Sequence, residues 1–301
     1  MLKLGIEEYE GYINLLGYKI FYKSYGAPGD SGRVLGLHGG PGGSHFVWLP
    51  LAELAQFGYR VVLYDQLGCG KSELPVDACR FPESIFTVQH YIEEVEEMRR
   101  ALGLGRIHLV GSSWGGQLAL AYALKYQENL KSLVIKSGVA SVPLCVAEMG
   151  KLKSELPREI QNVLKKYELV SDYENPEYLE AVQEFYKRHL CRMDPKPREL
   201  TAPVSKVVYN TMWGPNEFTC RGTLRDWDVS KELEKIRVPC LITVGKYDEV
   251  APKVAEDMHH RIAGSELVVF ENSSHSAPWE ERDRYIRTLR RFLAEAEQTE
   301  R

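Results

Sequence analysis

The stretch Val110–Gly116, which reads VGSSWGG, decides how this chain folds. It contains the pattern G-x-S-x-G, with a glycine two residues to either side of Ser113. The apolar run Arg106–Val110 before it is typical of a strand, and the Ala- and Leu-rich run Gly115–Tyr126 after it is typical of a helix. A strand, a sharp turn and a helix in this order form the context in which such a serine acts as a nucleophile.

The flanking glycines have a steric purpose at such a turn. Gly111 and Gly115 let the strand and the helix pass closely without a Cβ clash. Centring the pattern on Ser112 would place larger residues at both flanking positions, so we interpret Ser112 as structural. The alternative is that Ser113 merely caps a helix. If it is a nucleophile, its hydroxyl should lie above the carboxyl ends of the strands, where ligands bind in open α/β sheets.

Short apolar strands and helical patterns alternate on both sides of this turn. We therefore predict an α/β fold, a mostly parallel sheet covered by helices on both faces. The first two strands are expected to form an antiparallel hairpin. The predicted strands are Tyr9–Leu15, Tyr18–Tyr25, Val34–Leu37, Arg60–Tyr64, Arg106–Val110, Ser132–Ile135, Cys240–Val244 and Leu267–Phe270. The predicted helices are Leu51–Phe57, Val88–Leu102 with an acidic outer face, Gly115–Tyr126, Pro252–Ile262 and Asp283–Ala296.

The alternation stops between about Gly138 and Trp227. This stretch is charged and tyrosine-rich, and it holds helical patterns at Val146–Leu156 and Pro176–His189. The sequence therefore predicts a core formed by residues 1–138 and 228–301, with a helical cap at residues 139–227.

A serine hydroxyl needs a base to take its proton, and the base needs an orienting acid. In this kind of fold the chain order is serine, acid, histidine. Asp248 follows the predicted strand Cys240–Val244, and His275 follows Leu267–Phe270. Both should therefore meet Ser113 at the same edge of the sheet.

Other residues of suitable type fit less well. His259 and His260 lie in a helical pattern, with no spacing that indicates a metal site. Asp226 and Asp228 precede a strand instead of following it. The run Asp65–Ser72 ends in GKS like a phosphate-binding loop, but an aspartate stands where that motif needs its first glycine.

The oxyanion of an acyl-transfer intermediate needs N–H donors. One is the backbone N–H of Trp114, directly after the nucleophile. The loop His38–Gly43 (HGGPGG) is suited to supply the other, and Gly40 is the best candidate. Gly39 beside it is expected to contact the substrate.

Composition excludes several classes of protein. The chain has 301 residues and a net charge of -4 with dispersed basic residues, which does not favour nucleic-acid binding. No apolar run is long enough for a membrane span, and the first residues lack a signal peptide's apolar region. The six cysteines are scattered, so we expect free thiols in a cytoplasmic protein.

Six segments together resemble a known family: HGGPGG, YDQLGCGKS, VGSSWGG, GPNEF, VGKYDEV and the late SSH. They are similar to the proline iminopeptidases (prolyl aminopeptidases), which are α/β-hydrolases, and most similar to the tricorn-associated members. The resemblance implies release of N-terminal proline from short peptides, which a larger upstream protease supplies, without metal or cofactor. The family's nucleophile, acid and base fall on Ser113, Asp248 and His275.

The resemblance also implies carboxylates that hold the substrate's terminal ammonium, at Glu217 within GPNEF and at Glu249 beside the acid. The segment Ser276–Trp279 departs from the family pattern and could shape the pocket. A carboxylesterase or small-amide hydrolase on the same scaffold remains an alternative, but it would not need these two glutamates. A dehalogenase or epoxide hydrolase would carry a carboxylate in place of Ser113. A non-catalytic ligand receptor is the alternative from a different class.

Overall fold

The computed structural model describes residues 6–27 and 32–299. Its strands form one sheet in the order β1-β2-β4-β3-β5-β6-β7-β8, in which β1 pairs antiparallel with β2, and β2 with β4. The other neighbours are parallel, so the predicted hairpin and parallel sheet are confirmed. The strands are β1 (Glu8–Leu15), β2 (Tyr18–Tyr25), β3 (Gly32–Leu37), β4 (Tyr59–Tyr64), β5 (Ile107–Ser112), β6 (Leu130–Lys136), β7 (Cys240–Gly245) and β8 (Glu266–Phe270).

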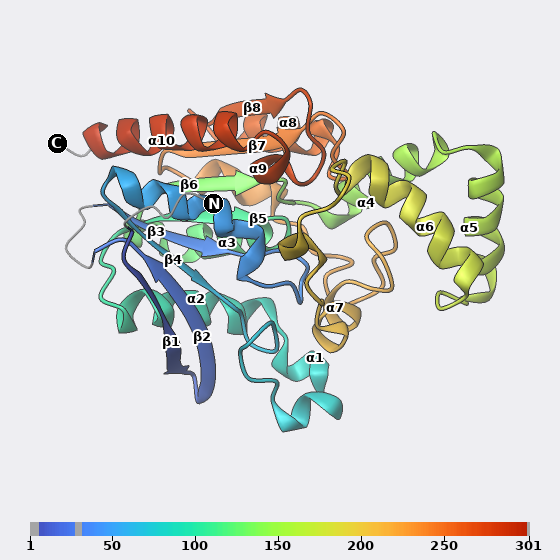
Figure 1. Cartoon of the computed structure of the whole chain (residues 1–301), viewed down its shortest axis with the longest axis horizontal. Helices are drawn as coiled ribbons and strands as arrows, with labels where there is room; N and C mark the ends of the chain where they lie inside the picture. The colour runs from blue at the N-terminus through green and yellow to red at the C-terminus, as the bar shows by residue number, and fades with distance from the viewer. Residues whose placement is uncertain (1–5, 28–31, 300–301) are drawn as a thin grey trace.

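Helices cover both faces of the sheet (Figure 1). On one face α2 (Val88–Ala101), α3 (Trp114–Tyr126) and α8 (Pro252–Arg261) contribute to a large apolar core. On the other face α10 (Arg282–Thr299) and the 3-10 helix η1 (His45–Phe57) enclose a second core. The shorter elements are η2 (Val76–Cys79), α1 (Pro82–Ile85), η3 (Gln127–Asn129), η5 (Ser230–Lys235) and α9 (Ala277–Glu280).

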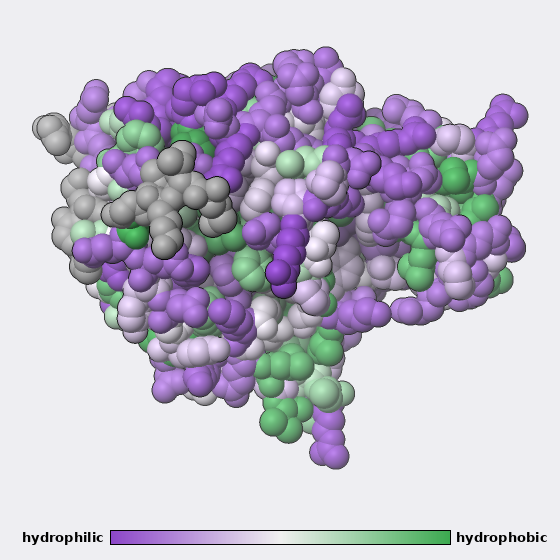
Figure 2. Space-filling view, in the orientation of Figure 1, coloured by the Kyte–Doolittle hydropathy of each residue, from purple (hydrophilic) through white to green (hydrophobic). Residues whose placement is uncertain are grey.

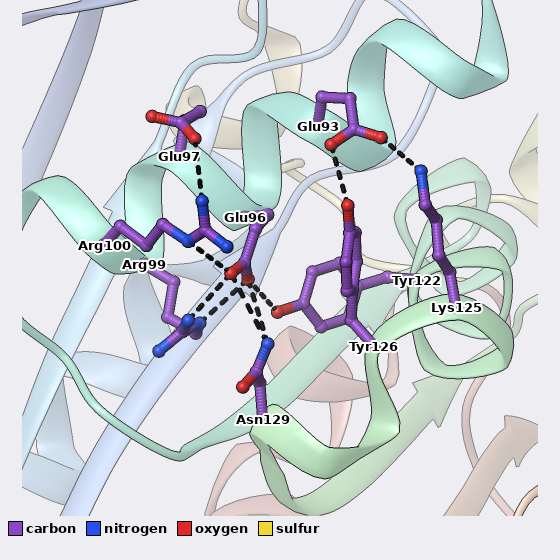
Figure 3. A network of polar contacts seen from close by, with 9 residues as sticks. All are labelled: Glu93, Glu96, Glu97, Arg99, Arg100, Tyr122, Lys125, Tyr126 and Asn129. Atoms are coloured by element: carbon purple, nitrogen blue, oxygen red, sulfur yellow. Dashed lines mark hydrogen bonds and ion pairs between the residues drawn. The ribbon is translucent and has the colours of Figure 1, made fainter.

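The structure corrects two predictions about helices. The helix predicted at Leu51–Phe57 begins earlier, at His45, and is 3-10 with Pro50 inside it, where proline cannot donate the hydrogen bond of an α-helix. The acidic outer face predicted for α2 is only partly correct, because Glu93 and Glu97 are partly exposed whereas Glu94 and Glu96 are buried. Burial of Glu96 is possible because basic and hydroxyl side chains surround its carboxylate (Figure 3).

The chain between β6 and β7 is mainly helical and projects beyond the ends of the strands (Figure 1). The patterns at Val146–Leu156 and Pro176–His189 correspond to α4 and α6. The sequence did not predict α5, whose amphipathic surface buries Leu164, or α7. The elements of this segment are α4 (Val142–Ser154), α5 (Arg158–Val170), α6 (Pro176–His189), η4 (Arg198–Thr201) and α7 (Lys206–Met212).

The face shown in Figure 2 is largely hydrophilic, apart from an apolar cluster over the η2–α1 segment. Exposed Leu74, Val76 and Phe81 belong to this cluster. All six cysteines are free. Within the described ranges, no helix combines the length and apolar character that crossing a bilayer requires.

Candidate active site

Ser113 occupies a strained turn between β5 and α3. Its φ of 56° and ψ of -120° lie in a region that side chains other than glycine rarely adopt. A Cβ on Gly111 would stand 2.1 Å from the Gly115 carbonyl oxygen, and one on Gly115 would stand 2.2 Å from that of Leu37. The two glycines are therefore required by the close approach that the sequence predicted.

Ser112, the other serine of the motif, is buried inside the sheet. It is the last residue of β5, is 1% exposed, and its Oγ lies 3.3 Å from Nζ of Lys136 on the neighbouring strand. Both serines line the cavity, but Ser113 is only partly buried. This difference supports Ser113 as the nucleophile candidate.

Asp248 and His275 form a buried pair at the ends of β7 and β8. His275 Nδ1 lies 2.7 Å from Asp248 Oδ1, which also accepts the N–H of Val250 at 2.9 Å. The Ser137 hydroxyl donates to the other carboxylate oxygen. Burial by itself would raise the pKa of Asp248, but the interactions with His275, Lys136 and Ser137 together outweigh it and lower that pKa. Asp248 is therefore held as a carboxylate.

His275 is 8% exposed and lines the same cavity as Ser113. Burial lowers the pKa of His275, and nearby Lys136 lowers it further, while Asp248 acts in the opposite direction. The imidazole is thus favoured in the neutral form that accepts a proton. Among the described residues, no hydrogen bond joins Ser113 Oγ to His275, and such contacts often tighten only when substrate binds.

The glycine-rich loop after β3 lies against the nucleophile. A Cβ on Gly39 would stand 2.9 Å from that of Ser113, so only glycine fits there. Gly40 adopts a φ of 112° and lines the cavity. Trp114 is the first residue of α3, where backbone N–H groups have no partner within the helix. Both predicted oxyanion donors therefore lie beside Ser113.

Gln66 joins the loop after β3 to the start of α3 through hydrogen bonds to His38 and Trp114, and sequence reasoning did not identify it. Its amide nitrogen donates to the His38 carbonyl at 2.9 Å, and its amide oxygen accepts from the Trp114 indole at 2.8 Å. Its backbone N–H also donates to His38 Nε2 at 3.0 Å. Gln66 lies within YDQLGCGKS, so the only signal was the resemblance of that segment.

The cavity above the nucleophile measures about 190 Å³. It brings together residues from the core and from the segment between β6 and β7. A narrower apolar extension continues past the nucleophile and is lined by Val139, Met149 and Trp213. Predicted site residues that line the main cavity are Gly39, Gly40, Ser113, Glu217, Glu249 and His275.

Glu217 and Glu249 line both the main cavity and its extension. Glu249 is 1% exposed, and its Oε2 has no hydrogen-bond partner. Burial raises the pKa of Glu217 to about 7. Burial, together with the charges of Glu217 and Asp248, raises the pKa of Glu249 well above its ordinary value. Two buried carboxylates placed together hold a proton readily, and a cationic ligand would replace it.

The end of α6 touches the loops that carry these residues. The His189 carbonyl accepts the N–H of Glu249 at 3.2 Å and that of His275 at 3.0 Å. Ser276, which lines the cavity, donates to the Leu190 carbonyl at 2.8 Å. Within the segment Ser276–Trp279, Ser276 therefore contacts the residue after α6 and forms part of the cavity wall.

The weaker candidates lie elsewhere. His259 contacts Ser265 at 2.9 Å, and Asp228 accepts from Ser141 at 2.7 Å. No group of histidine, cysteine and acidic side chains in the described part of the chain is arranged to hold a metal ion. Neither His259–His260 nor Asp226–Asp228 lines the cavity.

The sheet topology, the strained serine and the buried Asp–His pair define an α/β-hydrolase. A family model described as the alpha/beta hydrolase fold matches residues 32–282.

Relatives at higher identity narrow the class. The chain is 48% identical to a proline iminopeptidase of Saccharolobus solfataricus, with 94% of this chain and 92% of that protein covered. It is 46% identical to a proline iminopeptidase of Thermoplasma volcanium, with 94% and 96% covered. The crystal structure of proline iminopeptidase from Mycobacterium smegmatis is similar with a TM-score of 0.89 and 32% identity, covering 97% of this chain and 100% of that one. The chain belongs to the proline iminopeptidase family of α/β-hydrolases.

Proposed function

We propose that this protein is a serine aminopeptidase that releases N-terminal proline, and other N-terminal residues, from short peptides. The observation that carries the proposal is the placement of Glu217 and Glu249 in the cavity of Ser113, with one buried carboxylate oxygen lacking a partner. The names of the relatives agree with it.

In the proposed reaction His275 takes the proton of Ser113 as the hydroxyl attacks the carbonyl carbon of the first residue. The tetrahedral oxyanion accepts the N–H groups of Gly40 and Trp114. His275 then gives its proton to the leaving amine, and the C–N bond breaks to leave an ester on Ser113. Water attacks this acyl-enzyme by the same steps and releases the free amino acid.

The two glutamates identify the substrate as one with a free terminus. A protonated N-terminal proline carries two N–H bonds and one positive charge, so it can donate one charge-assisted hydrogen bond to each of Glu217 and Glu249. An acylated terminus has no charge and leaves both carboxylates desolvated without compensation. The extension lined by Val139, Met149 and Trp213 measures only about 10 Å³, so in this proposal the pyrrolidine ring occupies the main cavity beside it.

The segment at residues 139–227 acts in this proposal as a cap that limits peptide length. Its α6 is tied to the catalytic loops through the His189 carbonyl, so space around the nucleophile is restricted. We further propose that the substrates are fragments made by a larger upstream protease, in the cytoplasm, where the six free thiols would stay reduced.

The test uses Glu217→Gln and Glu249→Gln with two substrates. Turnover of a prolyl arylamide should weaken by about 1–3 kcal/mol in kcat/KM, because a charged hydrogen bond is lost. Hydrolysis of an aryl acetate, which has no amine, should change less than twofold. Glu180→Gln, on the exposed surface of α6, serves as the matched control.

The outcome separates the two enzyme hypotheses. Equal losses on both substrates would mean that the glutamates support the fold and not the amine. Unchanged turnover of both would remove the aminopeptidase proposal and favour the esterase or amidase.

A further inference from the structure

Lys136 is a buried lysine in the candidate active site, and neither the sequence analysis nor the proposed reaction uses it. It is the last residue of β6, is 1% exposed, and lines the cavity together with Ser113, Glu249 and His275. Burying an ammonium is costly unless opposite charges compensate it. Its presence there therefore needs an explanation.

Among the described residues, no local ion pair compensates the burial of the Lys136 ammonium. Its Nζ has one neutral hydrogen-bond partner, Ser112 Oγ at 3.3 Å. In the described part of the chain, no carboxylate oxygen lies within 4.0 Å of Lys136 Nζ, the distance at which the two would form an ion pair. The ammonium thus acts on its charged neighbours through space.

These neighbours come from four elements packed around the end of β6, and nearly all of the charged ones are acidic. The negative charge of Glu217 acts in turn on Glu249 and raises its pKa. The groups that act on Lys136 or share its surroundings are Asp248 and Glu249 between β7 and α8, His275 between β8 and α9, Glu280 on α9, and Cys191 after α6.

We propose that Lys136 is a positioning residue that supplies the fixed positive charge of the site. Its ammonium opposes a second positive charge on His275, which keeps the imidazole able to accept the Ser113 proton. The same charge favours the ionised form of Glu249. The second effect rests on the proposed aminopeptidase function, whereas the first concerns the triad alone.

The electrostatic directions agree with this assignment. Burial lowers the pKa of Lys136, and Asp248 and Glu249 oppose that change. Lys136 lowers the pKa of His275 and also that of Glu249. Without the ammonium, burial alone would oppose the carboxylates around His275, so its pKa would rise and favour the imidazolium form, which cannot act as a base.

The test is the pH profile of Lys136→Met with an aryl acetate, which reads His275 without the amine clamp. The acid limb of kcat/KM should move up by about one pH unit, since a charge near a titrating group has an effect of this size. Activity at pH 6 should fall about five- to tenfold and stay within twofold of wild type at pH 8.5. Labelling of Ser113 by a fluorophosphonate should show the same shift.

Two variants separate charge from structure. Ser112→Ala removes the hydrogen bond to Lys136 but keeps the ammonium, so its acid limb should not move. Lys131→Met removes a lysine at the other end of β6, where it pairs with Glu297 at 2.7 Å, and should leave the limb in place. An unmoved limb in Lys136→Met, or an equal loss of activity at every pH, would overturn the proposal.

A prolyl arylamide then tests the second effect. Lys136→Met should raise KM for this substrate at pH 6 by more than it raises KM for the aryl acetate. If the methionine variant does not fold, Lys136→Gln must show the same shift of the limb. If neither folds, wild type decides, because an acid limb at or above the ordinary histidine value of about 6.5 contradicts the proposal.

Discussion

The molecule contains two groups of buried glutamates whose surroundings shift their pKa values in opposite directions. On α2, Glu96 is surrounded by donors: it accepts from Arg99, Arg100, Tyr122 and Asn129 (Figure 3). Burial alone would raise its pKa, but the hydrogen bonds and the arginine charges outweigh burial and lower the pKa to about 2. This carboxylate belongs to the fold.

Glu217 and Glu249 lie in the cavity, and among the described residues no lysine or arginine pairs with either carboxylate; Lys136 acts on Glu249 only through space. Their pKa values are raised, to about 7 for Glu217, and an oxygen of Glu249 has no partner. A carboxylate that the fold supplies with partners stabilises the structure, whereas one left without them at a cavity is available to a ligand. The comparison therefore distinguishes structural acids from candidate binding acids.

Glu94 shows that a missing partner is not sufficient. Burial raises the pKa of Glu94 to about 8, and its Oε1 lacks a partner. Its other oxygen accepts the N–H of Leu67 at 3.0 Å, and Glu94 lines no cavity with Ser113. A binding acid needs both the unpaired oxygen and access for a ligand.

The largest effect should come from replacing Ser113, the candidate nucleophile in the cavity that Glu217 and Glu249 line. Ser113→Ala should remove up to about 10⁶-fold in kcat, on the scale of losing a triad serine, with the melting temperature nearly unchanged. Prolyl arylamide turnover and thermal unfolding check this. Near wild-type activity would show that the strained serine has no catalytic role.

The second largest effect should fall on stability, at Glu96. Glu96→Ala leaves the largely buried Arg99 and the buried Tyr122 hydroxyl without their carboxylate and should lower the free energy of unfolding by about 3 kcal/mol. The kcat/KM per folded molecule should be unchanged. Urea unfolding measures the loss, and Glu97→Ala, at a more exposed position on α2, is the matched control. If the two variants were equally stable, Glu96 would stabilise the fold no more than the more exposed Glu97 does. That result would contradict the assignment of Glu96 as a structural acid.

The pH dependence of stability should have opposite signs in the two groups. Glu96 has a folded pKa below its ordinary 4.5, so its contribution is present above pH 4.5 and is lost as the pH falls toward about 2. Glu217 has a folded pKa near 7, so the folded state holds the proton that the unfolded chain releases near 4.5. Wild type therefore loses stability as the pH rises from 4.5 to 7.

Glu217→Gln removes that loss. Its stability relative to wild type should increase by about 2–3 kcal/mol between pH 4.5 and pH 7, as measured by urea unfolding at both values. A constant difference across this range would mean that Glu217 titrates normally in the folded protein.

The smallest effect should be that of Ser112→Ala. Its hydroxyl has only a long contact with Lys136, so kcat/KM at pH 8 should fall less than tenfold. A loss as large as that of Ser113→Ala would assign the nucleophile to the other serine of the motif.

The sequence predicted the sheet because its strands are short apolar runs, and it predicted the Ser113 turn because the glycines around it are sterically required. It placed Asp248 and His275 by their positions after strands. It did not find Lys136, because the predicted strand ended at Ile135 and a lysine after a strand end is normally solvated. Burial of Glu96 was hidden for a similar reason, since its partners Tyr122 on α3 and Asn129 on η3 are 26 and 33 residues away.

Side-chain networks depend on which elements meet, and local patterns do not contain that information. Gln66 illustrates this, because its role follows from contacts with both His38 and Trp114. The sequence did not predict α5 because no strands alternate with the helices between β6 and β7. Only its amphipathic pattern could have indicated it.

The most direct measurement compares a prolyl arylamide with its N-acetyl twin on wild type and on the double variant Glu217→Gln/Glu249→Gln. Acetylation removes only the charge and N–H donors that the two carboxylates are proposed to bind. Wild type should hydrolyse the free-amine substrate at least a hundredfold faster, as expected when charged partners are left buried and unpaired. In the double variant most of this preference should disappear. Equal hydrolysis of the two substrates by wild type would contradict the account.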